Sequence, residues 1–579
     1  MGLLLSTVLI AAYAIATIDS ARLVQLVGQQ VKASTGRELQ IKGPVAIKIF
    51  PRLAVVAEQV SLSNTLWAED PEMLTIQQVA FSIAWLPLFD KRIEIQDVSL
   101  NQMQLFLQAG PPQSNVTGNW VMDAPNVASH SSDVDTGFVF ALAKVHMNQV
   151  SVIYKNSAGA VVDNLLIKGF DIKRAGKQTE INGQLRWNGL PITIKGHTDS
   201  WQRFMDDQPS VPTDFALDLN LGFNQQPVRL WGLIRPDPKV GPVVKLNIKA
   251  DALDLRLFAK SAPADAGKAQ SKNRIFSDDP IGFDQLPIWQ GQLQAEIGAL
   301  TLTDGIQLQQ LKSTLTASSE DAVSLSPLSF QMGGGHVVGD AQINGVHAQL
   351  PAVQIRGLAT GFTLGQVMAQ MGKGNQLSGG PAQIAFHLNS QGKTVHGLAA
   401  SANGEVQISV GAATASASLL NAGGDFFVSL LNAINPLHKN TDTTQLQCAV
   451  AYLPVQNGLV RINQSIGIET DRLDVMLDGQ VKLGPETLSL DISPKEKIGL
   501  TTGVNPAGLV QITGTLANPR MGINKTGFVK QATGVGLAIV TGGISLLAQN
   551  AAGVVSKSSP CQNVLRPWPQ VAGGLATMP

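Results

Sequence analysis

Alternation of apolar and polar residues with a period of two is the feature that most restricts how this 579-residue chain folds. Between positions 214 and 223, leucine or phenylalanine at every second position alternates with aspartate, alanine, asparagine or glycine. Successive side chains of a β-strand point to opposite faces, so this segment presents one apolar and one polar face. The pattern predicts antiparallel sheet with one face in water.

The same alternation returns around positions 253, 473 and 488. We take the apolar residues of these segments as candidates for one apolar face. They are Phe215, Leu217, Leu219, Leu221, Leu253, Leu255, Leu257, Leu473, Val475, Leu477, Leu488 and Leu490. Hydrophobic residues make up 44% of the chain but aromatic ones only 5%, and 56 glycines with 30 prolines supply turns. This composition describes many aliphatic strands with frequent turns between them.

A short strand motif also recurs. Gln59-Val60-Ser61-Leu62 is repeated as Asp97-Val98-Ser99-Leu100 and again as Gln149-Val150-Ser151-Val152. A chain that reuses one strand-turn unit is expected to build an elongated array.

Charge and motif content exclude several classes of function. The 42 basic and 42 acidic residues cancel, so nothing indicates a nucleic-acid partner. The eight histidines are scattered singly, without the motifs of zinc hydrolases, serine hydrolases or phosphate-binding loops. Gly333-Gly334-Gly335 lies between strand-like runs and predicts a turn. We therefore expect that the protein is not an enzyme and that it has no catalytic residues, no cofactor and no metal site.

The segment from Gly2 to Ile18 is uncharged, and about 17 residues is close to the shortest membrane-spanning helix. It predicts a transmembrane anchor. The alternative is a cleaved signal peptide, for which Ala12-Tyr13-Ala14 or Ala14-Ile15-Ala16 would be the cleavage site.

Composition divides the rest of the chain. Segments rich in Pro, Ser, Asn and Gly, or in mixed charges, predict linkers between strand-rich regions. The predicted order is an anchor at 1–19, a β region at 20–110, a linker at 111–137, a β region at 138–258, a linker at 259–280, a β region at 281–525 and an apolar helix with a tail at 526–579. Short helices are expected at 20–33, 364–371 and 419–434. The segment 528–549 is either a buried or capping helix or a second membrane span.

Several ordered blocks resemble the AsmA family. TGRELQIKGPV, FPRL, EQVSLSN and LPLFDKRIEIQDVSL are similar to its N-terminal signature. LSPLSFQMGGGHVVGDAQING and VQITGTLANPRMGINK, among other blocks after residue 281, are similar to its C-terminal region. The resemblance implies a mainly β bacterial envelope protein with one N-terminal transmembrane helix. Its sheet would be elongated, antiparallel and curled lengthwise into a taco-like groove, with few short helices.

The resemblance also implies a function. Such a protein would be anchored in the inner membrane, with most of the chain in the periplasm, and would serve outer-membrane biogenesis as a phospholipid conduit. The candidate leucines and their neighbours would line an aliphatic groove. Phospholipids, the inner membrane and envelope proteins of the periplasm or outer membrane would be its partners. A non-catalytic scaffold that assists outer-membrane protein assembly is the alternative, and a hydrolase with a concealed site is a third.

The periplasmic location that the resemblance implies bears on the two cysteines, Cys448 and Cys561. In an oxidising periplasm an isolated pair favours a disulfide, which would clip the C-terminal tail onto the strand that begins near Leu446.

Overall fold

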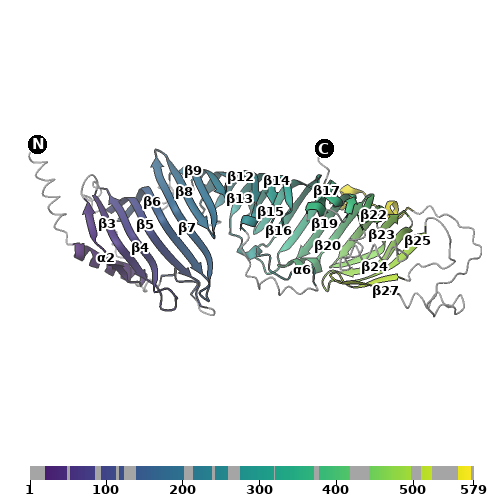
Figure 1. The fold of residues 1–579 in the computed structure, drawn as a ribbon, viewed down its shortest axis with the longest axis horizontal. Coiled ribbons are helices and arrows are strands. Elements are labelled where there is room, and N and C mark those ends of the chain that lie inside the picture. Colours follow the sequence, from purple (N-terminus) through teal and green to yellow (C-terminus); the bar gives the residue numbers. More distant parts are fainter. Residues whose placement is uncertain are drawn as a thin grey trace, which may run out of the picture. The chain divides into compact units, whose positions relative to one another are not determined.

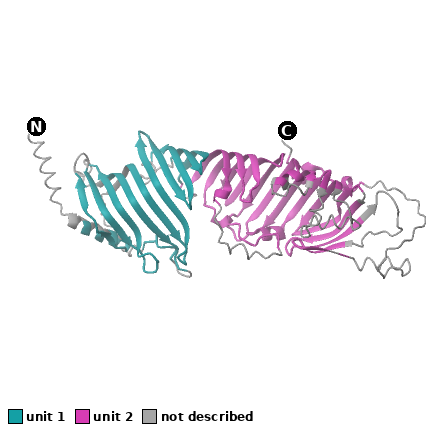
Figure 2. Ribbon diagram, viewed as in Figure 1, with its two compact units in different colours: residues 1–236 teal, residues 237–579 magenta. Residues whose placement is uncertain are grey.

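The computed structural model describes residues 20–48, 53–84, 93–111, 116–122, 138–200, 213–237, 241–258, 274–318, 320–370, 377–416, 443–471, 473–496, 510–523 and 559–575. Most of these residues lie in β-strands (Figure 1). The chain forms two compact units, residues 1–236 and 237–579 (Figure 2). Their division falls inside the region predicted at 138–258, and the segment boundaries given above stay a prediction.

Unit 1 begins with helix α2 (Ser20–Thr35), where a helix was predicted. Its strands are β1 (Leu39–Ile41), β2 (Val45–Lys48), β3 (Leu53–Ser63), β4 (Glu72–Ile83), β5 (Ile93–Gln108), β6 (Phe138–Lys155), β7 (Val161–Ala175), β8 (Gln178–Trp187), β9 (Leu190–Asp199), β10 (Phe215–Phe223) and β11 (Gln226–Arg235). β1 and β2 both pair with β3, and each later strand pairs with the next.

Unit 2 follows the same plan. Its strands are β12 (Val243–Asp254), β13 (Gln290–Thr301), β14 (Gln307–Ser318), β15 (Ala322–Met332), β16 (Gly335–Asn344), β17 (Ala352–Thr363), β18 (Leu377–Gly379), β19 (Pro381–Gln391), β20 (Asn403–Val410), β21 (Ala413–Ser416), β22 (Thr443–Gln456), β23 (Leu459–Thr470), β24 (Leu473–Lys482), β25 (Thr487–Glu496), β26 (Val510–Thr515) and β27 (Pro519–Ile523). The short pieces are η1 (Leu255–Phe258), η2 (Phe283–Gln285), α5 (Leu364–Gln370), α6 (Val395–Ser401), α10 (Pro560–Val564) and α11 (Trp568–Val571).

The sheets are mixed, which corrects the prediction of a purely antiparallel sheet. β5 runs parallel to β6 in unit 1, and β12 runs parallel to β13 in unit 2. Parallel neighbours require a long connection that returns the chain to the starting end of the strand. The segments 109–137 and 255–289, which include both predicted linkers, make these two returns. All other described pairs within the units are antiparallel.

Two local predictions are confirmed. α5 covers most of the helix predicted at 364–371. Gly333 and Gly334 form the turn between β15 and β16, with φ values of 56° and 81°. Positive φ at both central residues is the requirement of a tight hairpin turn, which glycine meets without steric cost.

An aligned irregularity crosses strands β3 to β6. Residues 59, 77, 102 and 149 lie opposite one another, and regular register pairs flank them on both sides. Gln59, Gln102 and Gln149 have φ values of 52°, 50° and 53°. Each strand thus has one residue at this level that lies between regular register pairs, and in three of the four strands this residue has a positive φ. We call this line the crease of unit 1.

The crease explains the recurring strand motif. Val60 and Val150 directly follow the crease glutamines of β3 and β6, and Met103 follows that of β5. The aligned copy in β5 is therefore Gln102-Met103-Gln104-Leu105, whereas Val98 pairs with Val145.

No helix in the described part of the chain is long and apolar enough to cross a membrane. The anchor predicted at 1–19 and the helices predicted at 419–434 and 528–549 lie outside the described residues. These three interpretations stay predictions.

Candidate functional site

An uninterrupted row of apolar residues crosses ten strands of unit 1. Residues paired directly across neighbouring strands share one face of the sheet. From β2 to β11 the row is Ile47, Val55, Phe81, Val98, Val145, Ile172, Ile181, Gly196, Leu219 and Leu230. We call the side that carries this row the apolar face of unit 1. The predicted candidates Leu217 and Leu221 flank Leu219 on this face.

The neighbouring row, one residue along each strand, is polar over most of its length. It consists of Ser82, Asp97, Lys144, Lys173, Glu180, His197, Asp218 and Trp231. We call this side the polar face of unit 1. The alternation read from the sequence thus separates two faces across the whole unit.

Arg229 contacts two other residues of the polar face near β10. Its guanidinium contacts both carboxylate oxygens of Asp218, at 3.1 and 2.8 Å, and lies 4.9 Å from the centre of the Trp231 ring. The hydrogen bond from Arg229 lowers the pKa of Asp218 below its usual value. Because this pair is solvent-exposed, its contribution to stability is small.

Unit 2 contains a second apolar row, which crosses fourteen strands. From β12 to β27, omitting β18 and β21, it is Leu246, Leu293, Leu315, Leu325, Ala341, Ile355, Leu388, Gly404, Val455, Val460, Val481, Leu488, Gly514 and Pro519. We call this the apolar face of unit 2. No charged residue interrupts either row.

Exposure divides the candidate residues into two groups. Phe215, Leu217, Leu219, Leu221 and Leu253 are partly exposed. Val475, Leu477 and Leu490 are 0% exposed and Leu488 is 4% exposed, in a core that also contains Ile492 and Ile512. The apolar face is therefore open to small molecules in part of the described chain and closed around β24 and β25. Leu473 lies at the start of β24.

Two candidates do not lie on a strand. β12 ends at Asp254, and Leu255 and Leu257 belong to the 3-10 helix η1. The carboxylate of Asp254 accepts a hydrogen bond of 2.9 Å from the backbone N–H of Arg256, and this local bond turns the chain out of the strand. The predicted alternation through 253, 255 and 257 is thus wrong after Leu253, which pairs with Leu300.

Leu490 provides a stability test of the division between partly exposed and fully buried candidate residues. We expect Leu490→Ala to lower the free energy of unfolding by about 3 to 5 kcal/mol, because a fully buried leucine leaves a cavity. Leu219→Ala should cost only about 1 kcal/mol, because its side chain keeps partial contact with solvent. Denaturant unfolding of both variants measures the difference. Equal losses would show that both leucines belong to equally closed cores.

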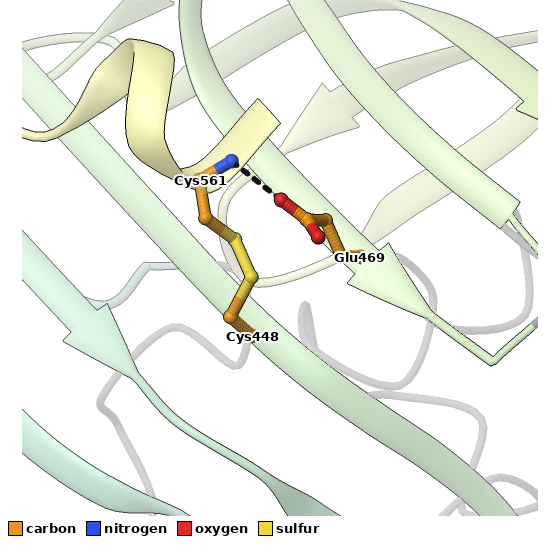
Figure 3. A group of neighbouring side chains, drawn as sticks. All are labelled: Cys448, Glu469 and Cys561. Atoms are coloured by element: carbon orange, nitrogen blue, oxygen red, sulfur yellow. Dashed lines mark hydrogen bonds between the residues drawn. A yellow bond between two sulfur atoms is a disulfide. The ribbon is translucent and has the colours of Figure 1, made fainter. Parts of the chain in front are cut away.

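The two cysteines are joined in the structure (Figure 3). Cys448 on β22 and Cys561 on α10 form a disulfide with a Cα–Cα distance of 6.5 Å across 113 positions. Glu469 lies beside them and accepts a hydrogen bond of 3.0 Å from the backbone N–H of Cys561. These three residues have the spacing of metal ligands. Because both sulfurs are in the disulfide, neither is a thiolate, and the cluster is structural in this redox state.

The disulfide fixes a C-terminal segment, residues 559–575, which we call the strap. It lies on the face of unit 2 opposite the apolar face. Gln407, 0% exposed, donates to the carbonyl of Arg566 at 3.0 Å and accepts from its N–H at 2.7 Å. Val571 and Ala572 are fully buried against β17 and β19. The side-chain amide of Gln407 thus bonds both backbone groups of Arg566, as a neighbouring strand would.

Tyr452 lies beneath the strap. Its hydroxyl donates to Glu405 at 2.6 Å, and the guanidinium of Arg566 lies 5.5 Å from its ring centre. Burial, followed by the bond to Glu405, raises the pKa of Tyr452 to about 12. The tyrosine therefore stays neutral and keeps its proton for this hydrogen bond at physiological pH.

Three histidines contact aspartates: His146 with Asp171, His347 with Asp321 and His396 with Asp278. The bond to Asp321, followed by that to the Leu286 carbonyl, raises the pKa of His347. Both ring nitrogens of His347 face acceptors, at 2.5 and 3.0 Å, so its protonated form is the better bonded one. The first contact joins the paired strands β6 and β7, whereas the other two join segments outside the strands.

The comparisons with known proteins agree with the resemblance of the sequence blocks to the AsmA family. The family model described as AsmA family matches residues 1–211 and 234–465. A curated protein of Escherichia coli (strain K12), named AsmA family protein YhjG, is 24% identical over 297 residues, which cover 51% of this chain and 40% of that protein. The alignment thus spans less than half the length of that relative. No solved structure matches the chain. Since the family model covers most of its length, the chain belongs to the AsmA family.

Proposed function

We propose that the protein is a phospholipid conduit of the bacterial envelope, anchored in the inner membrane by residues 1–19, with the bulk of the chain in the periplasm. Membership of the AsmA family supports an envelope location. In this proposal acyl chains move along the apolar faces of the two units, and the protein serves outer-membrane biogenesis without catalysing a reaction.

The single observation that carries the proposal is the continuity of the apolar rows. Across ten strands of unit 1 and fourteen of unit 2, no position in the row is charged or polar. An ordinary sheet with one wetted face would bury such a row under a second layer. In the described part of unit 1, each strand contacts its sheet neighbours and helix α2 contacts β1. Most side chains of the row are partly exposed, and a partly exposed aliphatic surface of ten strands supports a binding surface.

The change in burial along unit 2 indicates where a lipid would leave the apolar face. Near β12 to β17 the row is partly exposed, and from β22 to β26 it becomes a closed core. A lipid that follows the face would therefore leave it before β22. Leu488 and Leu490 then maintain the fold, whereas Leu217 and Leu219 contact the lipid.

Site-specific photo-crosslinking tests the proposal. Leu219 and Asn220 are neighbours on β10 that lie on opposite faces, and Asn220 is exposed. A photo-reactive amino acid at position 219 should capture phospholipid in cells, detected as a lipid adduct by mass spectrometry. The same group at position 220 should capture none. Equal labelling at both positions, or a folded protein without lipid at 219, would favour the scaffold alternative.

A further inference from the structure

The polar face of unit 1 carries a dense array of hydrogen-bonding side chains around the crease, of which only Glu58 is charged. Two consecutive residues of each strand lie on this face, because the crease inserts one residue. In β3, for example, Ala57 and Val60 are both buried in the apolar cluster, whereas Gln59 between them is exposed. Three rows result, which we call the polar array. They are Glu58, Gln78, Asn101 and Asn148; Gln59, Gln77, Gln102 and Gln149; and Ser61, Thr75, Gln104 and Ser151.

The first row is a closed hydrogen-bonded ladder. Gln78 donates to Glu58 at 3.3 Å, Asn101 donates to Gln78 at 3.5 Å and Asn148 donates to Asn101 at 2.9 Å. These bonds hold the four strands at one level, so the first row has a structural role. It fixes the position of the two rows beside it.

The other two rows keep most of their hydrogen-bonding capacity. Gln102 donates to Gln149 at 3.2 Å. Among the described residues, the side chains of Gln59, Gln77 and Gln104 have no hydrogen-bond partner in the protein, and the same holds for the hydroxyls of the third row. Each free amide offers both a donor and an acceptor.

These side chains line one depression. It has a volume of about 620 Å³ and is bounded at one end by Lys42 and Glu72, whose charges lie 3.8 Å apart. Because the two charges neutralise each other, the lining attracts neither anions nor cations. Its polar composition also distinguishes it from the apolar face on the other side of the same strands. An acyl chain would leave the amides unpaired, at a cost that disfavours its binding.

We propose that the polar array binds an extended, neutral glycan, a β-1,4-linked chain of pyranose sugars. Hydroxyl and acetamido groups of sugars need paired donors and acceptors, which primary amides and serine or threonine hydroxyls supply together. The crease presents one such set on every strand, at the strand spacing of about 4.8 Å. This spacing is close to the length of one sugar residue in an extended β-linked chain, so successive sugars meet successive strands. The proposal does not depend on the lipid function, because the two sites lie on opposite faces.

The test is binding of a β-1,4-linked N-acetylglucosamine hexamer to the full chain in lipid nanodiscs, by calorimetry. We expect a Kd on the order of 0.1 to 1 mM, since the site is shallow and polar. The double variant Gln77→Ala with Gln104→Ala should weaken binding at least about fivefold. Gln184→Ala, which removes an exposed amide from the same face of β8, should leave the affinity unchanged. Circular dichroism checks that all variants are folded.

Maltohexaose provides the geometric control, because its α-1,4 linkages curl the chain away from the line of the crease. It should bind much more weakly than the β-1,4 hexamer. Absence of binding by the β-1,4 hexamer, equal binding to the double variant, or equal binding of maltohexaose would each overturn the proposal. Phospholipid transfer should be unaffected by the double variant, which separates this site from the conduit.

Discussion

Leu219→Arg is expected to reduce phospholipid transfer by the anchored protein at least tenfold while leaving unit 1 folded. Leu219 lies within the ten-residue apolar row, between Gly196 on β9 and Leu230 on β11. Its side chain is partly exposed, so an arginine can keep its charge hydrated in the empty protein. A passing acyl chain must displace that water, and an unpaired cation in apolar surroundings costs several kcal/mol. Even about 1.4 kcal/mol on the barrier gives a tenfold loss of rate.

Transfer between donor and acceptor vesicles that are linked by the purified protein measures this effect, with thermal unfolding as the check on stability. Gln184→Arg is the matched control. Gln184 is an exposed residue on the polar face of β8, opposite the uncharged Thr193. Asp218 would be a poor control, because replacing it breaks its ion pair with Arg229. Normal transfer by Leu219→Arg, or an equal loss in Gln184→Arg, would contradict the conduit.

The sequence allowed the two faces to be predicted because the alternation is a local property. Phe215 to Leu221 needed no partner strand to reveal which side is apolar. Which residues meet across strands is a non-local property, set by turns and irregularities. The row that joins Leu219 to Gly196 and Leu230 therefore could not be read from the sequence. The hydrogen bond that Asp254 accepts from the backbone of Arg256, which ends β12 before Leu255 and Leu257, could not be read from the sequence either.

The crease was visible in the sequence, although its meaning was not. The repeated Gln-Val-Ser motif marks it at Gln59 and Gln149. In β5 the motif copy at Asp97 has the better sequence match, yet Gln102 takes the equivalent conformation. An extra residue in a strand changes backbone angles without changing the hydrophobic pattern much, so the sequence match misses it. Glutamine followed by an apolar residue, as in Gln102-Met103, is the sequence signal that would locate the remaining copy.

The candidate set illustrates a second limit. Leu219 and Leu490 have the same local pattern, but one is partly exposed and the other fully buried. Burial depends on how the sheet closes around β22 to β26, which alternation does not encode. The partner of Cys448 was accessible from the sequence because the chain has only two cysteines. The pairing of Gln407 with the backbone of Arg566, far apart in sequence and without a motif, was not.

Removal of the disulfide is expected to detach the strap and lower the free energy of unfolding of unit 2. With 113 positions between the cysteines, the chain-entropy model gives about 4 to 5 kcal/mol for the Cys448→Ala, Cys561→Ala double variant. The strap consists of two helices too short to be stable alone, so its remaining contacts must hold it. Denaturant unfolding measures the loss, and hydrogen exchange should show faster exchange of residues 559–575 than of β24 and β25.

Gln407→Leu separates the contribution of the disulfide from that of the amide pair. This variant keeps the covalent link but leaves the N–H and carbonyl of Arg566 without their partner, at a cost of about 1 to 3 kcal/mol. Its strap should therefore stay attached while exchanging faster around Arg566. Since the strap lies opposite the apolar face, the double cysteine variant should still transfer phospholipid once folded. Unchanged exchange of the strap after removal of both cysteines would show that the side chains of Val571 and Ala572, with Gln407, hold it without the covalent bond.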